Sequence, residues 1–116
     1  MRENLEWIGE RNPAERYRDG ATGLFEREQF LLELDREFLR SQRSGDPFTV
    51  AFLELDDPLE EEKGLKELGT LIQSNVRDVD LACRCGPDLY AVLLLKTSAE
   101  VAHVAGERLS RAVHQH

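Results

Sequence analysis

The sequence is poor in cysteine and has no long apolar run, and each shortage argues against a class of protein. Its only cysteines, Cys83 and Cys85, are too few for a disulfide framework, so we expect a reducing compartment, the cytoplasm. No apolar run approaches the roughly 20 residues of a membrane-spanning helix. The first residues also lack the apolar segment of a signal peptide. The sequence therefore predicts a protein that does not interact with membranes.

Positive charge is scarce as well, because 15 Lys and Arg residues face 23 Asp and Glu residues and give a formal net charge of −8. Proteins that bind nucleic acid polymers or anionic membranes without specificity need a basic face. The charge balance argues against such a face, although a local basic pocket for a small anion is compatible with it. Hydrophobic residues make up 41% of the 116 residues, which suits one folded domain with a modest core.

Apolar residues at helical spacing predict three helices. The first runs from about residue 25 to residue 43, and its apolar residues are Phe30, Leu31, Leu34 and Phe38. The second lies within residues 56–76, where two glycines weaken it. The third follows Thr97, which forms a capping box with Glu100. Its shared apolar face contains Val101, Val104, Ala105, Leu109 and Val113.

Runs of β-branched and aromatic residues predict three strands. They cover residues 48–56, roughly 79–85 and 89–96, and the last two are joined by a tight turn. We therefore expect an α+β fold, a small and mostly antiparallel sheet with helices packed on it. Residues 1–18 are expected to form a short N-terminal helix or linker, and residues 19–116 the domain.

Three stretches of the chain resemble the motifs of GGDEF domains, the diguanylate cyclase family. They are "DGATGLFEREQF" (19–30), "FLELD" (52–56) and "RDVDLACRCGPDLYAVLL" (77–94), followed by "AGERL". Each motif is short, but their order and their spacing in the second half of the chain make the resemblance fairly specific. The resemblance implies the palm-like fold of nucleotidyl cyclases.

The resemblance also implies that the sheet is incomplete. GGDEF domains continue beyond the point where the likeness ends, near Val113, with a further strand beside the strand that matches 48–56. Without that strand the edge of 48–56 is open, and an open edge invites pairing with another chain. We expect a homodimer, a partner strand, or cover from the N-terminal segment that contains Trp7 and Ile8.

In this family the hairpin turn approaches the phosphates of GTP, and carboxylates hold two magnesium ions. The matching positions here are Glu54, Asp56, Gly86, Pro87, Asp88, Leu89 and Tyr90. Pro87 replaces a glycine, and Leu89 replaces a glutamate. Glu54 is one methylene longer than the aspartate it matches, and magnesium demands near-octahedral geometry. The family's guanine-reading residues have no counterpart in "PLEEEKGLKELG" (58–69). We therefore expect a degenerate domain that is not an enzyme and holds no metal or cofactor.

The family's inhibitory site for cyclic di-GMP is better preserved. Arg77 and Asp80 match its R-x-x-D motif, and Arg108 falls where the following helix commonly adds a second arginine. Arginine offers a bidentate fork to phosphate and a plane for stacking, and aspartate can accept from guanine N–H groups. An alternative is that Arg77 and Asp80 form only a surface ion pair or cap the preceding helix.

Two functional hypotheses follow. The first is an inactive signalling domain that senses cyclic di-GMP through Arg77, Asp80 and Arg108 and regulates by association. The second is a nucleotide-independent interaction or dimerisation module, which uses the open strand edge or the helical face near Phe30 and Phe38. Other candidate groups indicate no site. The two cysteines are expected in the core or at a strand edge, and His103, His114 and His116 lack ligand or triad spacing.

Overall fold

The structure is a computed structural model in which residues 18–57 and 59–115 are described. The N-terminal helix or linker expected over residues 1–18 therefore lies outside the described residues, apart from Arg18. The same holds for the cover expected from Trp7 and Ile8. No helix within the described ranges is long and apolar enough to cross a membrane.

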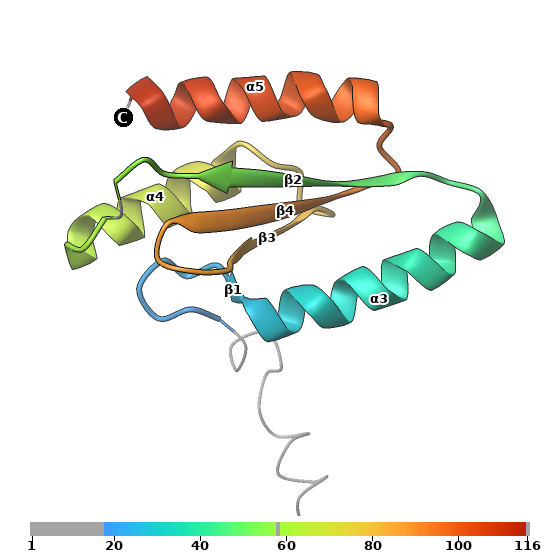
Figure 1. The fold of residues 1–116 in the computed structure, drawn as a ribbon, viewed down its shortest axis with the longest axis horizontal. Helices are drawn as coiled ribbons and strands as arrows, with labels where there is room; N and C mark the ends of the chain where they lie inside the picture. Colours follow the sequence, from blue (N-terminus) through green and yellow to red (C-terminus); the bar gives the residue numbers. More distant parts are fainter. Residues whose placement is uncertain (1–17, 58, 116) are drawn as a thin grey trace, which may run out of the picture.

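The centre of the fold is a sheet with the strand order β1-β3-β4-β2 (Figure 1). Its strands are β1 (Phe25–Glu26), β2 (Phe48–Glu54), β3 (Leu81–Arg84) and β4 (Leu89–Leu95). β4 pairs antiparallel with both β2 and β3, whereas β1 pairs parallel with β3. The prediction of a small, mostly antiparallel sheet is confirmed, and β1 is the one strand that the sequence did not predict.

Within the described residues, three helices cover the two faces of this sheet. They are α3 (Arg27–Ser44), α4 (Glu62–Ser74) and α5 (Ala99–Gln115). α3 lies on one face, while α5 lies on the opposite face (Figure 1). α4 contributes to the same core cluster as α5. The α+β fold predicted from the sequence is therefore confirmed, including the order helix, strand, helix, hairpin and helix.

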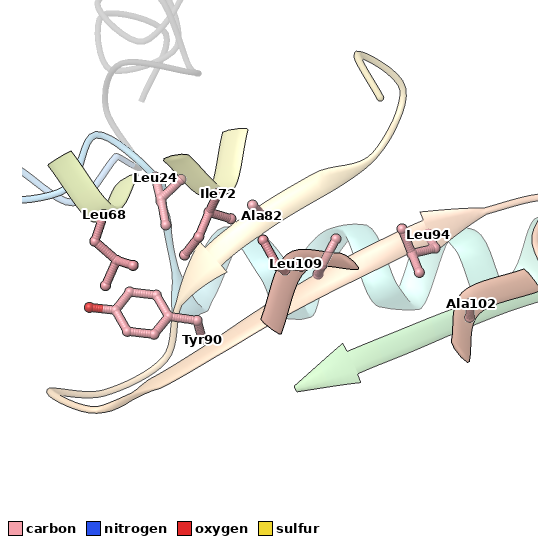
Figure 2. Close-up of a cluster of buried hydrophobic side chains, with 9 residues drawn as sticks. Leu24, Leu68, Ile72, Ala82, Tyr90, Leu94, Ala102 and Leu109 are labelled. Atoms are coloured by element: carbon pink, nitrogen blue, oxygen red, sulfur yellow. The ribbon is translucent and has the colours of Figure 1, made fainter. Parts of the chain in front are cut away.

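β4 is the most buried strand, and its alternating side chains form the base of two core clusters. Tyr90, Val92 and Leu94 point to the α4 and α5 face, where Figure 2 shows Tyr90 and Leu94 among the buried side chains of both helices. Ala91 and Leu93 point to the α3 face. Successive residues of a strand point to opposite faces of the sheet. The apolar residues of β4 therefore contribute to the core on both faces.

Only part of the apolar face predicted for α3 is buried. Phe30 is buried and Leu34 packs against the same cluster, as helical periodicity predicts. Leu31 and Phe38, in contrast, are about half exposed, at 48% and 52%. The predicted interaction face near Phe30 and Phe38 is thus split, because Phe30 belongs to the core and only Phe38 is on the surface.

The start of α5 differs in detail from the prediction. The side chain of Ser98, not of Thr97, accepts a hydrogen bond from the first turn of the helix, at 3.4 Å from the Val101 amide. The Thr97 hydroxyl instead donates to the Leu95 carbonyl at 2.7 Å. The predicted capping box of Thr97 and Glu100 is therefore wrong, because the end of β4 already uses the Thr97 hydroxyl.

Gly69, in the middle of α4, is explained by a close approach of two backbones. A Cβ atom at this position would lie 2.0 Å from the carbonyl oxygen of Thr22. The loop of residues 19–24 can therefore pack on α4 only because position 69 has no side chain. This contact explains why a residue that weakens a helix occupies its centre.

Candidate functional site

A cavity of about 440 Å³ opens between α5 and the sheet, at the end of β4 that lies away from the hairpin turn. Three cationic side chains line it, from the loop before β3, the end of β4 and α5. They are Arg77, Lys96 and Arg108. Asp80 also lines this space, which we call the Arg77 cavity. The volume of the cavity lies within the range of small-molecule sites. Arg77, Asp80 and Arg108, the residues predicted to bind cyclic di-GMP, all line it.

Arg77 is fixed by its hydrogen bonds. Its Nε donates to Asp80 Oδ2 at 3.0 Å and its Nη2 donates to Asp80 Oδ1 at 2.8 Å. Nη2 also donates to the Leu95 carbonyl and to the Thr97 hydroxyl. The hydrogen bonds to Asp80 raise the pKa of Arg77, so the guanidinium stays charged and held at the mouth of the cavity.

Asp80 is the buried half of this pair. Its side chain is 1% exposed, whereas that of Arg77 is 54% exposed. Besides the Arg77 side chain, its carboxylate accepts hydrogen bonds from the backbone amides of Arg77 and Leu95, both at 3.1 Å. Asp80 therefore ties the loop before β3 to the end of β4. It orients Arg77 and offers little free oxygen surface to a ligand.

Arg108 and Lys96 complete the charged side of the cavity. Arg108 Nη2 donates to the Asn75 carbonyl at 3.1 Å, which holds α5 against the end of α4. Lys96 has a positive φ of 48°, a conformation that non-glycine residues adopt uncommonly. Sequence reasoning missed Lys96, and its only sequence signal is a cation directly after a buried strand.

The walls of the cavity are apolar. Ala51, Val92 and Leu94 contribute from the sheet, and Val101 and Val104 contribute from α5. These two valines are 61% and 65% exposed, although helical periodicity placed them on the packed face. The first half of α5 therefore leaves an apolar surface beside the three cations rather than burying it against the sheet.

The opposite end of the hairpin contains the predicted nucleotide turn. The amides of Cys85 and Gly86 both donate to the Leu89 carbonyl, at 2.8 and 3.1 Å, which confirms the tight turn. Arg84 beside it forms a 3.4 Å ion pair with Asp19. Asp19 also accepts hydrogen bonds from the Thr22 amide and hydroxyl. Sequence reasoning missed this ion pair, because its partners are far apart in the chain.

The electrostatics of Asp19 follow from these contacts. Burial alone raises the pKa of Asp19, but the hydrogen bonds from Thr22 and the charge of Arg84 outweigh burial and lower the pKa below its ordinary value. The carboxylate therefore stays ionised and pins the loop of residues 19–24 to the hairpin.

The acidic residues that match the family's metal positions lie near this turn. Glu54 pairs with Leu89 across the sheet, and the Leu55 amide donates to the Asp88 carbonyl at 2.8 Å. Glu54 and Asp56 are exposed. In residues 18–57 and 59–115, no three acidic, histidine or cysteine side chains are close enough together to hold a metal ion.

Tyr90 matches the last position of the GGDEF motif and is fully buried. Its hydroxyl has no hydrogen-bond partner in the described part of the chain. Burial raises the pKa of Tyr90, although the nearby Arg84 side chain acts to lower it. Gly86, Pro87 and Asp88 form the turn itself, and Pro87 is exposed. The side chain of Tyr90 belongs to the core rather than to a nucleotide-binding surface.

Comparison with known protein families agrees with this geometry. The family model described as "Diguanylate cyclase, GGDEF domain" matches residues 60–116. The chain has the fold and sequence features of a GGDEF domain. Two curated relatives are each 30% identical to it. The response regulator PleD of Caulobacter vibrioides matches over 100 residues, 78% of this chain and 22% of PleD. The diguanylate cyclase DgcS of Shewanella oneidensis matches over 107 residues, 84% of this chain and 36% of DgcS.

Solved structures show the same GGDEF fold. The diguanylate cyclase SiaD of Pseudomonas aeruginosa, in complex with its activator SiaC, superposes with a TM-score of 0.78 at 27% identity. The match covers 97% of this chain and 45% of SiaD. The GGDEF domain of DgcB from Caulobacter crescentus, in complex with c-di-GMP, superposes with a TM-score of 0.74 at 22% identity, covering 85% of this chain and 60% of that one. The second likeness shows the fold alone.

The prediction that this GGDEF domain is not an enzyme is wrong. The matching family model describes diguanylate cyclases, and DgcS is named as one, so the findings point to an enzyme. The prediction relied on replacements at the metal and phosphate positions, such as Leu89 and Pro87, together with the missing guanine-reading residues in 58–69. These differences do not decide activity by themselves, and carboxylates remain at this end of the sheet, including Glu54 and Asp56. The chain spans less than two fifths of the length of these two relatives.

Proposed function

We propose that this GGDEF signalling domain binds cyclic di-GMP in the Arg77 cavity. One observation carries the proposal: Arg77 and Arg108, which come from separate elements, line the same cavity. In a chain with a net charge of −8, a cavity with three cations is a local exception. It suits a small ligand with two phosphates better than a polymer.

Arg77 and Arg108 each have N–H groups that make no hydrogen bond within the described residues. In the described ranges, Arg77 uses Nε and Nη2 for protein acceptors, and Arg108 uses only Nη2. The Nη1 group of Arg77 and the Nε and Nη1 groups of Arg108 are therefore available to phosphate oxygens. Charge-assisted hydrogen bonds of this kind are stronger than neutral ones, and Arg77 needs no rearrangement because Asp80 already holds it.

The apolar wall gives the bases a surface. Val101 and Val104 are exposed on α5, and Val92 and Leu94 lie on the sheet side of the same cavity. Cyclic di-GMP has two flat guanine rings, and burying their faces against an apolar surface is favourable. Its two phosphates are stabilised by cationic side chains. Both requirements are met within this one cavity. The DgcB structure, solved in complex with c-di-GMP, supports the choice of ligand.

The alternative is that the Arg77–Asp80 pair is only structural. Its hydrogen bonds to Leu95 and Thr97 show that it does join two segments, and such a pair needs no ligand. Arg108 separates the two explanations better than Arg77, because within residues 18–57 and 59–115 its side chain makes a single hydrogen bond. A ligand site requires Arg108, whereas a structural pair at Arg77 does not.

Calorimetric titration with cyclic di-GMP tests the proposal. We expect the wild type to bind and Arg108→Ala to bind at least about 10-fold more weakly, because one charge-assisted contact contributes about 1.5–3 kcal/mol. Arg111→Ala is the matched control, since Arg111 is exposed on the same helix and does not line the cavity. Absence of binding by the wild type, or equal loss in both variants, would overturn the proposal.

A second candidate function is self-association through the edge of β2. β2 is at the end of the strand order, and Phe52 on it is 64% exposed. Open edges with apolar side chains favour pairing with another strand. We propose a second copy of the chain as the partner. Sedimentation should show a dimer that Phe52→Lys weakens, and a monomeric wild type at high concentration would exclude this function.

A further inference from the structure

The two cysteines form a close pair on the α3 face of the sheet. The Sγ atoms of Cys83 and Cys85 are 3.2 Å apart, and both residues are free thiols. Cys83, at the end of β3, is completely buried in the cluster of Phe30, Ala91 and Leu93. Cys85 follows β3 and is only partly buried. Such a pair has one thiol that reagents can reach and one that the core protects.

We propose that Cys83 and Cys85 are a reversible oxidation site, which a peroxide converts into an intramolecular disulfide. A disulfide has an S–S distance of about 2.04 Å, so the sulfur atoms must approach by about 1.2 Å. Cys83 cannot move far because the core surrounds it. Cys85 can, because it lies outside the strand and directly precedes Gly86 of the turn.

The reaction balances with a hydroperoxide as the oxidant. The Cys85 thiolate attacks one peroxide oxygen, the O–O bond breaks, and a sulfenic acid forms while water or an alcohol leaves. The Cys83 sulfur then attacks Cys85 Sγ, the S–O bond breaks, and the departing hydroxide takes the Cys83 proton as water. Two thiols are oxidised to one disulfide, the peroxide is reduced, and a dithiol reductant reverses the change by exchange.

The order of these steps follows from the environment of each sulfur. Cys83 is buried beneath α3, and burial raises the pKa of its thiol, so it is a poor first nucleophile. Cys85 is the more accessible thiol and should react first. Cys83 then resolves the sulfenic acid, since the two sulfur atoms are already in contact.

The consequence of oxidation lies at the hairpin turn. Arg84 stands between the two cysteines, where its side chain donates to the Gly86 carbonyl and forms the ion pair with Asp19. The Cys85 amide also donates to the Leu89 carbonyl to close the turn. Moving Cys85 toward Cys83 pulls on all three contacts. The pair therefore couples the oxidation state to the conformation of residues 84–89.

Peptide mapping after exposure to hydrogen peroxide tests this proposal. Trypsin cleaves after Arg84 and separates the peptides of residues 78–84 and 85–96, each with one cysteine. In the oxidised monomer we expect both thiols to resist alkylation, and the two peptides to remain linked until a dithiol is added. Hydrogen exchange of the amides in residues 84–89 should become at least about 3-fold faster on oxidation.

Two variants control the result. In Cys83→Ala, peroxide should leave Cys85 as a sulfenic acid that cannot be resolved, and in Cys85→Ser the buried Cys83 should react far more slowly. The exchange change at residues 84–89 should be absent from both variants. Alkylation of both thiols after peroxide treatment of the folded wild type would overturn the proposal, as would disulfides only between molecules. A disulfide with unchanged exchange at the turn would overturn the coupling.

Discussion

The two ends of the β3–β4 hairpin differ in how their charged side chains are arranged. At the end away from the turn, Arg77, Lys96 and Arg108 line one cavity. At the turn, Glu54 and Asp56 point into solvent, and the cation Arg84 is engaged by Asp19. The three cations at the first end share one space, whereas the charged side chains at the turn do not line that cavity.

The difference arises from how each end is stabilised. The cavity end is held by a buried carboxylate, because Asp80 fixes Arg77 and the end of β4 while leaving other donors free. The turn end is held by backbone contacts and by the packing of α4 on the loop of residues 19–24. The first arrangement leaves charged donors open to the cavity, and the second joins the loop of residues 19–24 to α4 and the hairpin. Substitutions at one end should therefore affect stability or ligand affinity differently from substitutions at the other end.

Gly69→Ala should have the largest effect, and it acts at the turn end. The added Cβ would lie 2.0 Å from the Thr22 carbonyl oxygen, so we expect the free energy of unfolding to fall by about 3 kcal/mol. Gly64→Ala in the same helix is the control, because its Cβ meets only Leu59 at ordinary contact distance. It should raise stability by about 0.5–1 kcal/mol. Equal effects in chemical denaturation would contradict the close approach.

Asp80→Asn should weaken the cavity end. The carboxylate accepts hydrogen bonds from both Arg77 and Leu95. Their loss should cost about 1–2 kcal/mol of stability, since Arg77 is half exposed and its charge is screened. Cyclic di-GMP should also bind more weakly, because Arg77 is released. Asp78→Asn, an exposed neighbour, should change neither quantity. Denaturation and calorimetry measure both, and unchanged affinity in Asp80→Asn would contradict the positioning role.

Tyr90→Phe should raise the stability of the turn end. The buried Tyr90 hydroxyl lies near Arg84 but has no partner at hydrogen-bond geometry in residues 18–57 and 59–115, and an unsatisfied buried polar group is destabilising. We expect the free energy of unfolding to rise by about 1 kcal/mol, with no change in affinity for cyclic di-GMP. A loss of stability in thermal unfolding would show that the hydroxyl does have a partner in the molecule.

Asp19→Asn should have the smallest effect, visible as a change in pH dependence. The folded state lowers the pKa of Asp19, so its ionisation stabilises the fold above the unfolded pKa of about 3.9. That contribution is lost as the pH falls through the lower folded pKa. As the pH falls below about 4, the free energy of unfolding should therefore decrease less in the variant than in the wild type. Glu26→Gln is the control, and parallel pH profiles for wild type and Asp19→Asn would contradict this role.

Features set by local periodicity could be predicted from the sequence. The three helices, β2 and the hairpin follow from apolar spacing and turn residues, and Arg77, Asp80 and Arg108 do converge. β1 could not be predicted, because two residues carry no pattern and become a strand only by pairing with β3.

Features set by distant contacts could not be predicted. The Asp19–Arg84 ion pair joins two residues that are 65 positions apart in the chain, and no local pattern connects them. The cap of α5 moved from Thr97 to Ser98 because Leu95 competes for the Thr97 hydroxyl. Val101 and Val104 follow helical periodicity and are nevertheless exposed, since periodicity cannot tell how closely a helix approaches its sheet.

Backbone NMR with cyclic di-GMP distinguishes the two ends of the hairpin in a single titration. Increasing ligand should shift the amide resonances around Arg77, Lys96 and Arg108, which line the cavity. The resonances of residues 84–89 at the turn should stay in place. Shifts concentrated at the turn, or no shifts in either region at saturating ligand, would contradict the account.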